Sequence, residues 1–87
     1  MAEDLRQRAL HSVDAELERL RRLGAPGVAA LAEGSPHDAE AGDVRLTTRV
    51  EPEGERLMVL VEAWRGRRIL ATGGFAMTPD GQTHTPD

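Results

Sequence analysis

The chain has 87 residues, with 11 basic residues against 15 acidic ones and no cysteine. This length allows one domain with a small core, and the lack of cysteine excludes disulfides and thiolate metal sites. The net charge of -4 argues against general nucleic-acid binding, which needs a surplus of cations.

The first helix is predicted over residues 3–23, where apolar residues recur at helical spacing and form one stripe. Gly24 is suited to the position after a helix end, and Pro26 prevents continuation. The segment "PGVAALAEG" (26–34) predicts a short second helix with Pro26 near its start and Gly34 as its stop. Residues 3–33 therefore form the helical part.

Residues 34–43 are rich in helix and strand breakers, and we expect a polar connector there. From Val44 the apolar period changes from 3.6 to 2, which predicts a β-meander over 44–77 with strands 44–51, 56–64 and 67–77. Gly73 and Gly74 indicate a bulge or bend in the third strand. The segment "TPDG" (78–81) predicts a turn, and residues 82–87 form either a frayed tail or a short fourth strand.

The expected fold is therefore α+β, a single domain over residues 1–87. An N-terminal helix and a short second helix pack on one face of a three-stranded antiparallel β-meander. No segment is long and apolar enough to cross a bilayer, and the charged N-terminus lacks the features of a signal peptide. We expect a cytoplasmic protein without a membrane partner. All eleven basic residues are arginine, and lysine, asparagine and tyrosine are absent, so we infer a GC-rich bacterial genome.

The alternation gives the sheet two apolar faces. A two-residue turn at 65–66 pairs Leu60 with Ala71, and an even first loop pairs Val50 with Leu57. The inner face should receive the helices, and it carries Val44, Leu46, Val50, Leu57, Val59, Val61, Ala63 and Leu70. The outer face carries Met58, Leu60, Trp64, Ile69, Ala71 and Phe75, with Arg45, Arg49, Arg56, Arg67, Glu51 and Glu62 between them.

No sequence motif with a known catalytic mechanism is present. His11 and Asp14 lie on one side of the first helix, and the connector gathers His37, Asp38, Glu40 and Asp43, but neither group has the spacing of a metal site. We expect no metal, no cofactor and no catalytic residue. Glu62 is the carboxylate best placed to act as an acid or base, although an ion pair with Arg45 explains it without catalysis.

The outer face is the surface that most needs an explanation, because the chain's own helices cover only one side of the sheet. The predicted function is a non-catalytic protein–protein interaction module, which binds its own copy or another protein as an adaptor, inhibitor or immunity-type protein. The alternative is a small anionic ligand or single-stranded nucleic acid on the same face, with Trp64 stacking on a ring. The predicted interface residues are Met58, Leu60, Trp64, Ile69, Ala71, Phe75, Arg45, Arg49, Arg67 and Glu62.

Overall fold

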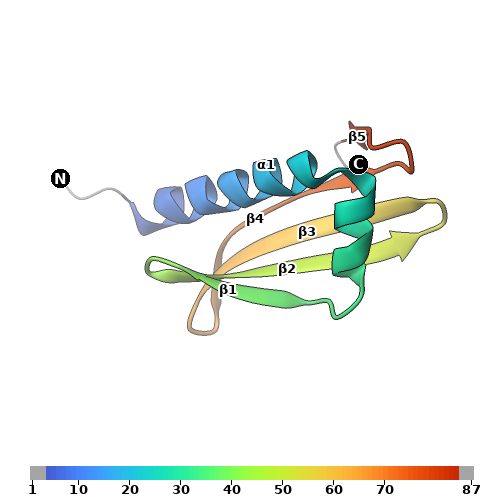
Figure 1. The fold of residues 1–87 in the computed structure, drawn as a ribbon. Helices are drawn as coiled ribbons and strands as arrows, with labels where there is room; N and C mark the ends of the chain where they lie inside the picture. The colour runs from blue at the N-terminus through green and yellow to red at the C-terminus, as the bar shows by residue number, and fades with distance from the viewer. Residues whose placement is uncertain (1–3, 85–87) are drawn as a thin grey trace.

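A computed structural model of the protein describes residues 4–84 (Figure 1). The fold is α+β, as predicted, and one helix precedes a sheet of antiparallel strands. The elements are α1 (Leu5–Ala32), β1 (His37–Ala41), β2 (Val44–Glu53), β3 (Arg56–Arg65), β4 (Arg68–Met77) and β5 (Thr83–His84). The strands follow one another across the sheet in chain order, so each pairs with its neighbour in sequence. Within residues 4–84, no helix has the length and apolar character to span a membrane.

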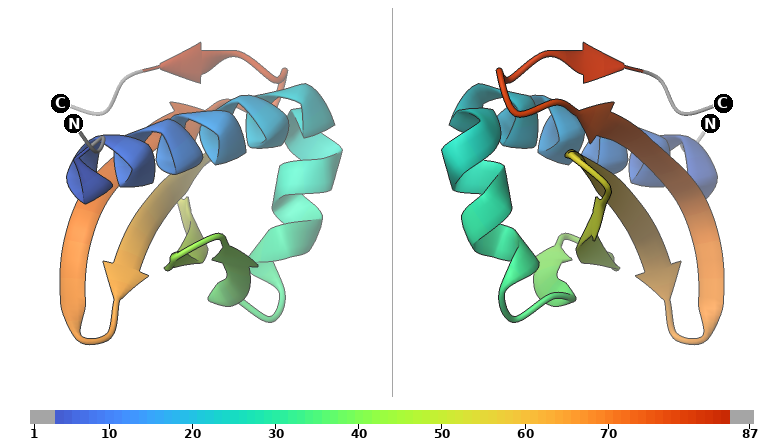
Figure 2. Two further views of the ribbon diagram at one scale, coloured as in Figure 1. Left: turned by 90° about the vertical axis from the view of Figure 1, so that its left-hand side faces the viewer. Right: turned by 90° about the vertical axis from the view of Figure 1, so that its right-hand side faces the viewer.

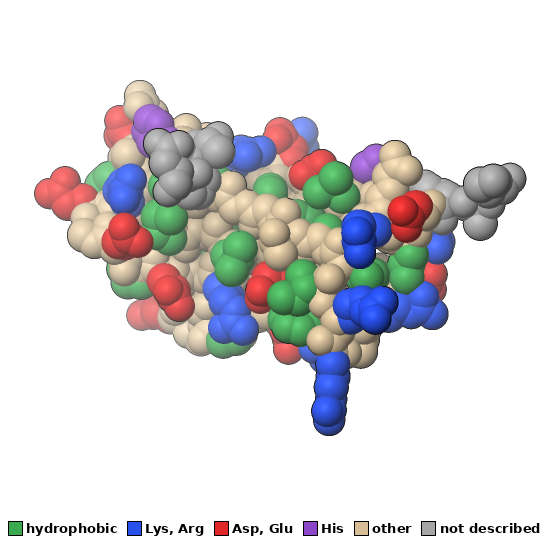
Figure 3. Space-filling view, turned by 180° about the vertical axis from the view of Figure 1, so that it is seen from behind, with side chains coloured by type: hydrophobic (Ala, Val, Ile, Leu, Met, Phe, Trp, Pro, Cys, Tyr) green, Lys and Arg blue, Asp and Glu red, His purple; other side chains and the backbone are tan. Residues whose placement is uncertain are grey.

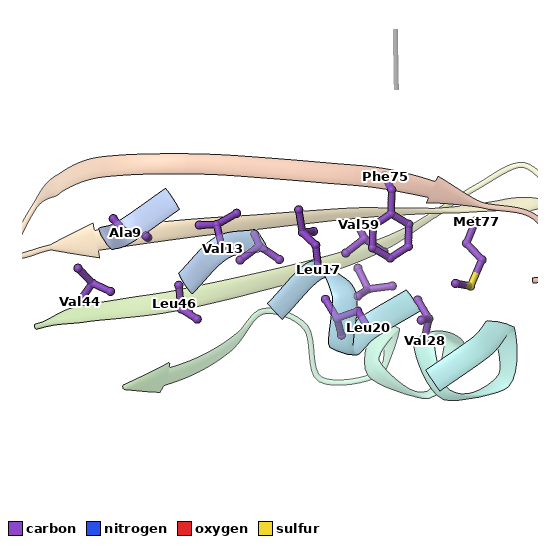
Figure 4. Packing of buried hydrophobic residues seen from close by; sticks show 13 residues of the cluster. Ala9, Val13, Leu17, Leu20, Val28, Val44, Leu46, Val59, Phe75 and Met77 are labelled. Atoms are coloured by element: carbon purple, nitrogen blue, oxygen red, sulfur yellow. The ribbon is translucent and has the colours of Figure 1, made fainter. Parts of the chain in front are cut away.

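The sheet curls around the first segment of α1, as the two side views show (Figure 2). Its concave side is the inner face, and the buried core lies between that face and the helix (Figure 4). All eight residues predicted for the inner face belong to this core or pack against it. The buried apolar residues are Ala9, Val13, Leu17, Leu20 and Val28 from α1 and Val44, Leu46, Val50, Val59, Val61, Ala63, Phe75 and Met77 from the sheet.

Helix α1 is capped by Asp4, whose side chain accepts a hydrogen bond from the backbone N–H of Arg6 at 2.9 Å. The first helix was predicted to end at Gly24, but Gly24 is a kink within α1. The predicted short second helix is the segment of α1 that follows this kink. Gly24 has φ 73° and ψ 176°, a backbone conformation open essentially only to glycine. The helix resumes at once, because proline is well tolerated in a first helical turn. Two segments of one helix therefore cover the inner face.

The prediction of a connector over 34–43 is wrong, because residues 37–41 form strand β1 on one edge of the sheet. The segment "HDAEA" alternates only alanine with charged residues, which is a weak signal for a strand. Its polar character suits an edge, where charged side chains discourage pairing with other chains. Two contacts hold the approach to β1: Ser35 Oγ accepts from the Val50 N–H at 3.0 Å, and His37 Nε2 lies 2.8 Å from the Leu31 carbonyl oxygen.

The β2–β3 hairpin has the even loop that was predicted, but its register differs by two residues. Val50 pairs with Val59 rather than Leu57, since the loop consists of Gly54 and Glu55 alone. A shift of two residues leaves every side chain on its predicted face, because side chains alternate with a period of two.

The β3–β4 hairpin departs further from the prediction. Its turn is Gly66–Arg67, and the strand register shifts after the pair formed by Trp64 and Ile69. Ala63 pairs with Ala71, so Leu70 is an extra residue on β4, that is, a β-bulge. The predicted bulge at Gly73 and Gly74 thus lies three residues earlier.

The bulge reverses the faces of the rest of β4. Phe75 and Ala71, predicted on the outer face, lie on the inner face opposite Val59 and Ala63. Phe75 is only 1% exposed and is the largest fully buried side chain. Ala71 is partly buried against the same core. Neither side chain therefore belongs to the outer face.

Strand β5 pairs only Thr83 with Met77 and His84 with Ala76. Of the two alternatives for residues 82–87, the strand holds at 83–84, and residues 85–87 lie outside the described part of the chain.

Candidate functional site

The outer face is the convex side of the sheet. Its apolar side chains lie on β3 and at the start of β4. Met58 and Trp64 are partly buried, whereas Leu60 is 40% and Ile69 42% exposed. From β1 to β4 the outer face carries Asp38, Glu40, Arg45, Thr47, Arg49, Glu51, Glu53, Arg56, Met58, Leu60, Glu62, Trp64, Ile69, Thr72, Gly74 and Ala76.

Cross-strand pairing groups these side chains into rows that run across the strands. Arg45, Trp64 and Ile69 form one row, and Arg49, Leu60 and Gly74 form another. Seen from behind the view of Figure 1, apolar side chains lie between charged ones rather than in one continuous patch (Figure 3). The face thus has the mixed composition of a non-obligate interface rather than that of an exposed core.

A shallow hollow of about 640 Å³ lies in the middle of the outer face. Its lining includes Arg49, Met58, Leu60, Thr72 and Gly74. The hollow lies beside Leu60 because Gly74, its cross-strand partner, has no side chain. A side chain of a partner could enter here and contact Met58 and Leu60.

Glu62 forms its ion pair with Arg49, and the predicted pairing with Arg45 is wrong. The Arg49 Nε donates to Glu62 Oε1 at 3.3 Å, and the Glu62 side chain is only 13% exposed. Arg45 lies one row further along, opposite Trp64. This pair neutralises the one carboxylate considered for acid–base chemistry, and it also occupies one of the arginines considered for binding an anion.

Thr47 and Asp38 are a polar pair that sequence reasoning missed. The Thr47 hydroxyl, on a residue 6% exposed, donates to Asp38 Oδ1 at 2.8 Å. Thr47 sits on the outer face of β2, but β1 shields it from the side. No indication of this pair came from the sequence, because strand β1 was not predicted. Without β1, β2 would be an edge strand, and Thr47 would have no partner beside it there.

The histidines and nearby acids do not converge. Asp38 is engaged by Thr47, and Asp43 pairs with Arg8 at 3.6 Å from the helix. His37 points at the end of α1, where Nε2 meets the Leu31 carbonyl oxygen. Across residues 4–84, no three side chains of the metal-ligating types lie together as a metal site would require.

Trp64 lies at the end of β3 and Arg67 in the turn that follows, and within residues 4–84 the cation–π contact of an arginine is made on α1 and β4 instead. The guanidinium of Arg21, on α1, lies 5.1 Å from the centroid of the Phe75 ring. Arg21 thus contacts the aromatic ring of a core residue. Arg67 is exposed in the β3–β4 turn.

A second hollow of about 370 Å³ lies where the second segment of α1 meets the end of β4. Its walls are mostly apolar, from Ala25, Pro26, Leu57, Met77 and Pro79, with Glu55 at the side. Small-molecule sites combine apolar walls with several convergent polar groups. The polar side chains in its lining are Glu55 and Thr78, and the Thr78 hydroxyl already donates to Asp80, so this hollow is a weaker candidate than the outer face.

The free edge of β4 is a further surface. β5 pairs only with Ala76 and Met77, so residues 68–75 of β4 have no strand beside them on the side away from β3 in the described part of the chain. From Ile69 to Met77 the strand carries no charge. An uncharged edge can accept another strand, which makes it the main rival of the outer face.

A scan of protein-family models and searches of curated proteins and of solved structures find no match to this chain.

Proposed function

We propose that this protein is a non-catalytic protein–protein interaction module whose outer face binds a second copy of the chain. The observation that carries this proposal is the placement of Met58, Leu60, Trp64 and Ile69 on the side of the sheet that α1 does not cover. Tryptophan, methionine and arginine are enriched in interfaces, and symmetric homodimers are the commonest soluble oligomers.

The physical reason is the desolvation of these side chains. Leu60 and Ile69 each keep about two fifths of their surface in water. Docking a second sheet would remove that apolar area from water, at roughly 25 cal/mol per Å². The hollow beside Gly74 gives a facing side chain of the second copy a place to enter.

The test is the solution mass of the protein, measured by light scattering and sedimentation over a range of concentrations. The wild type is expected to dimerise, and Leu60→Asp is expected to weaken the dimer by at least about thirtyfold, as for an interface hot spot. Trp64 is the only tryptophan, so its fluorescence emission should shift with dimerisation.

Leu10→Asp is the matched control. Leu10 is 44% exposed on α1, away from the sheet, so the same substitution there should leave the dimer intact. A wild type that is monomeric at high concentration would contradict the proposal. A dimer that survives Leu60→Asp would move the interface to the edge of β4.

The second candidate is the binding of an anionic ligand or single-stranded nucleic acid on the same face. It is favoured by Arg45 and Arg67, which flank Trp64, and it is opposed by the Arg49–Glu62 pair and the net charge of -4. A salt-dependent rise in melting temperature with an oligonucleotide, lost in Arg45→Ala, would support it.

A further inference from the structure

The two ends of the outer face carry opposite charges. At the end with the β3–β4 turn, the exposed charged side chains are Arg45 on β2, Arg67 in the turn and Glu40 on β1, whereas Arg65 and Arg68 pair with each other on the inner face. At the end with the β2–β3 turn they are Glu51, Glu53, Glu55 and Arg56. In Figure 3, blue side chains gather towards the right-hand side and red ones are more numerous on the left.

The exceptions do not cancel this polarity. Asp43, at the basic end, is paired with Arg8 of the helix at 3.6 Å, which leaves Glu40 as the other acid on that side of the sheet. Arg56, at the acidic end, is paired with Glu53 at 3.3 Å. After these pairs are set aside, the net charge of the outer face is positive beside the β3–β4 turn and negative beside the β2–β3 turn.

From this polarity we infer the orientation of the dimer: two copies pack outer face to outer face with their strands antiparallel. This inference rests on the proposed function. A two-fold axis between two facing sheets lies in the plane of contact. An axis along the strands would place each basic end on the partner's basic end, where like charges repel. An axis across the strands exchanges the ends and sets opposite charges together.

The row of Arg49, Leu60 and Gly74 is the natural place for that axis, because it passes through the exposed Leu60 and the hollow. The row of Arg45 and Trp64 and the row of Glu53 and Arg56 each lie four residues from it, about 13 Å on either side. Arg45 then faces Glu53 of the partner subunit. Trp64 faces Arg56 of the partner subunit, an arrangement that allows a cation–π contact.

A charge exchange tests this orientation. Arg45→Glu alone places two acids together at both symmetric contacts, and Glu53→Arg alone places two arginines together. Each is expected to weaken its own dimer by more than about tenfold. An equimolar mixture of the two variants restores opposite charges at both contacts, so it should form a heterodimer within about threefold of the wild-type affinity. The double variant R45E/E53R should dimerise by itself for the same reason.

The outcomes separate the orientation from the proposed function. If the wild type dimerises and Leu60→Asp prevents it, but the mixture dimerises no better than either variant alone, the antiparallel orientation is overturned while the outer face remains the interface. Dimerisation of both single variants at the wild-type affinity overturns it as well. A wild type that stays monomeric removes the proposed function and the orientation together. The control is circular dichroism of each variant, which should match that of the wild type if the fold is kept.

Discussion

Arg49 and Glu62 are joined across β2 and β3 by a hydrogen-bonded ion pair of 3.3 Å that lies beside Leu60 on the outer face. The Glu62 side chain is largely buried, whereas Arg49 keeps 44% of its side chain exposed. In its exposure to solvent, this ion pair is therefore intermediate between a surface salt bridge and a buried one.

The first prediction concerns the strength of this pair. A double-mutant cycle of Arg49→Ala and Glu62→Ala is expected to give a coupling of about 0.5–1 kcal/mol in the free energy of unfolding, because water screens the arginine. The coupling should decrease in 1 M salt. Urea denaturation of the four proteins measures it, and a coupling near zero at low salt would show that the pair adds nothing to stability.

The second prediction contrasts Phe75 with Ile69, which the sequence pattern places on the same face. Phe75→Ala removes the largest buried side chain and should cost about 3–5 kcal/mol. A domain of this size has little more stability than that, so the variant should be largely unfolded by circular dichroism. Ile69→Ala, at a 42% exposed position, should stay within about 1 kcal/mol of the wild type. Equal effects at the two positions would argue against the bulge at Leu70.

The third prediction concerns the close approach of α1 to β4 at Gly73. A Cβ at this position would lie 2.8 Å from Leu17 Cδ1 and 3.0 Å from Val13 Cγ1. Gly73→Ala should therefore lower the free energy of unfolding by about 1–3 kcal/mol. In a Leu17→Ala background the same change should cost much less, because the space has been vacated. Thr72→Ala, on the opposite face, is the control, and additive effects of the first two changes would contradict the contact.

The fourth prediction concerns the turn after β4. The Thr78 hydroxyl donates a hydrogen bond to Asp80 Oδ1, and the Gln82 N–H donates to the same oxygen at 3.4 Å. These bonds favour the charged carboxylate and hold the pKa of Asp80 below its ordinary value of 3.8. Their contribution to stability is present above that ordinary pKa and is lost as the pH falls through the lower pKa of the folded state.

Thr78→Val removes the stronger of the two donors, so the pKa of Asp80 should rise towards its ordinary value. A titration followed by NMR of the Asp80 carboxyl carbon measures the change, with Thr83→Val as the control on the neighbouring strand. An unchanged pKa in Thr78→Val would show that the backbone N–H of Gln82 is sufficient.

The α+β class and the inner face could be predicted from the sequence because both depend on apolar periodicity. Leu46 and Val50 each lie between two polar residues of β2, and burying such a pattern against a helix is what drives folding most strongly. The predicted start of the helix at residue 3 is two residues too early, because Asp4 caps the helix instead of lying in its first turn.

Strand β1 and the faces of β4 could not be predicted in this way. The apolar residues of β1 are two alanines, and what stabilises the strand is backbone pairing to β2 and the hydrogen bond between Asp38 and Thr47, neither of which can be read from apolar periodicity. The bulge at Leu70 is a property of two strands together, so the alternation of β4 by itself misplaced Phe75. The interface prediction consequently lost Phe75 and Ala71, while Met58, Leu60, Trp64 and Ile69 kept their face.

The extra residue at Leu70 has a consequence for how this chain can change in length. Deleting Leu70 itself would remove the bulge and leave Phe75 opposite Val59, whereas deleting one residue between Ala71 and Phe75 would move Phe75 and Met77 to the outer face. After a deletion in that regular part of the strand, every later side chain of β4 would point to the opposite face of the sheet. The part of β4 after the bulge should therefore accept substitutions far more readily than a single insertion or deletion, whereas the loss of Leu70 should preserve the core.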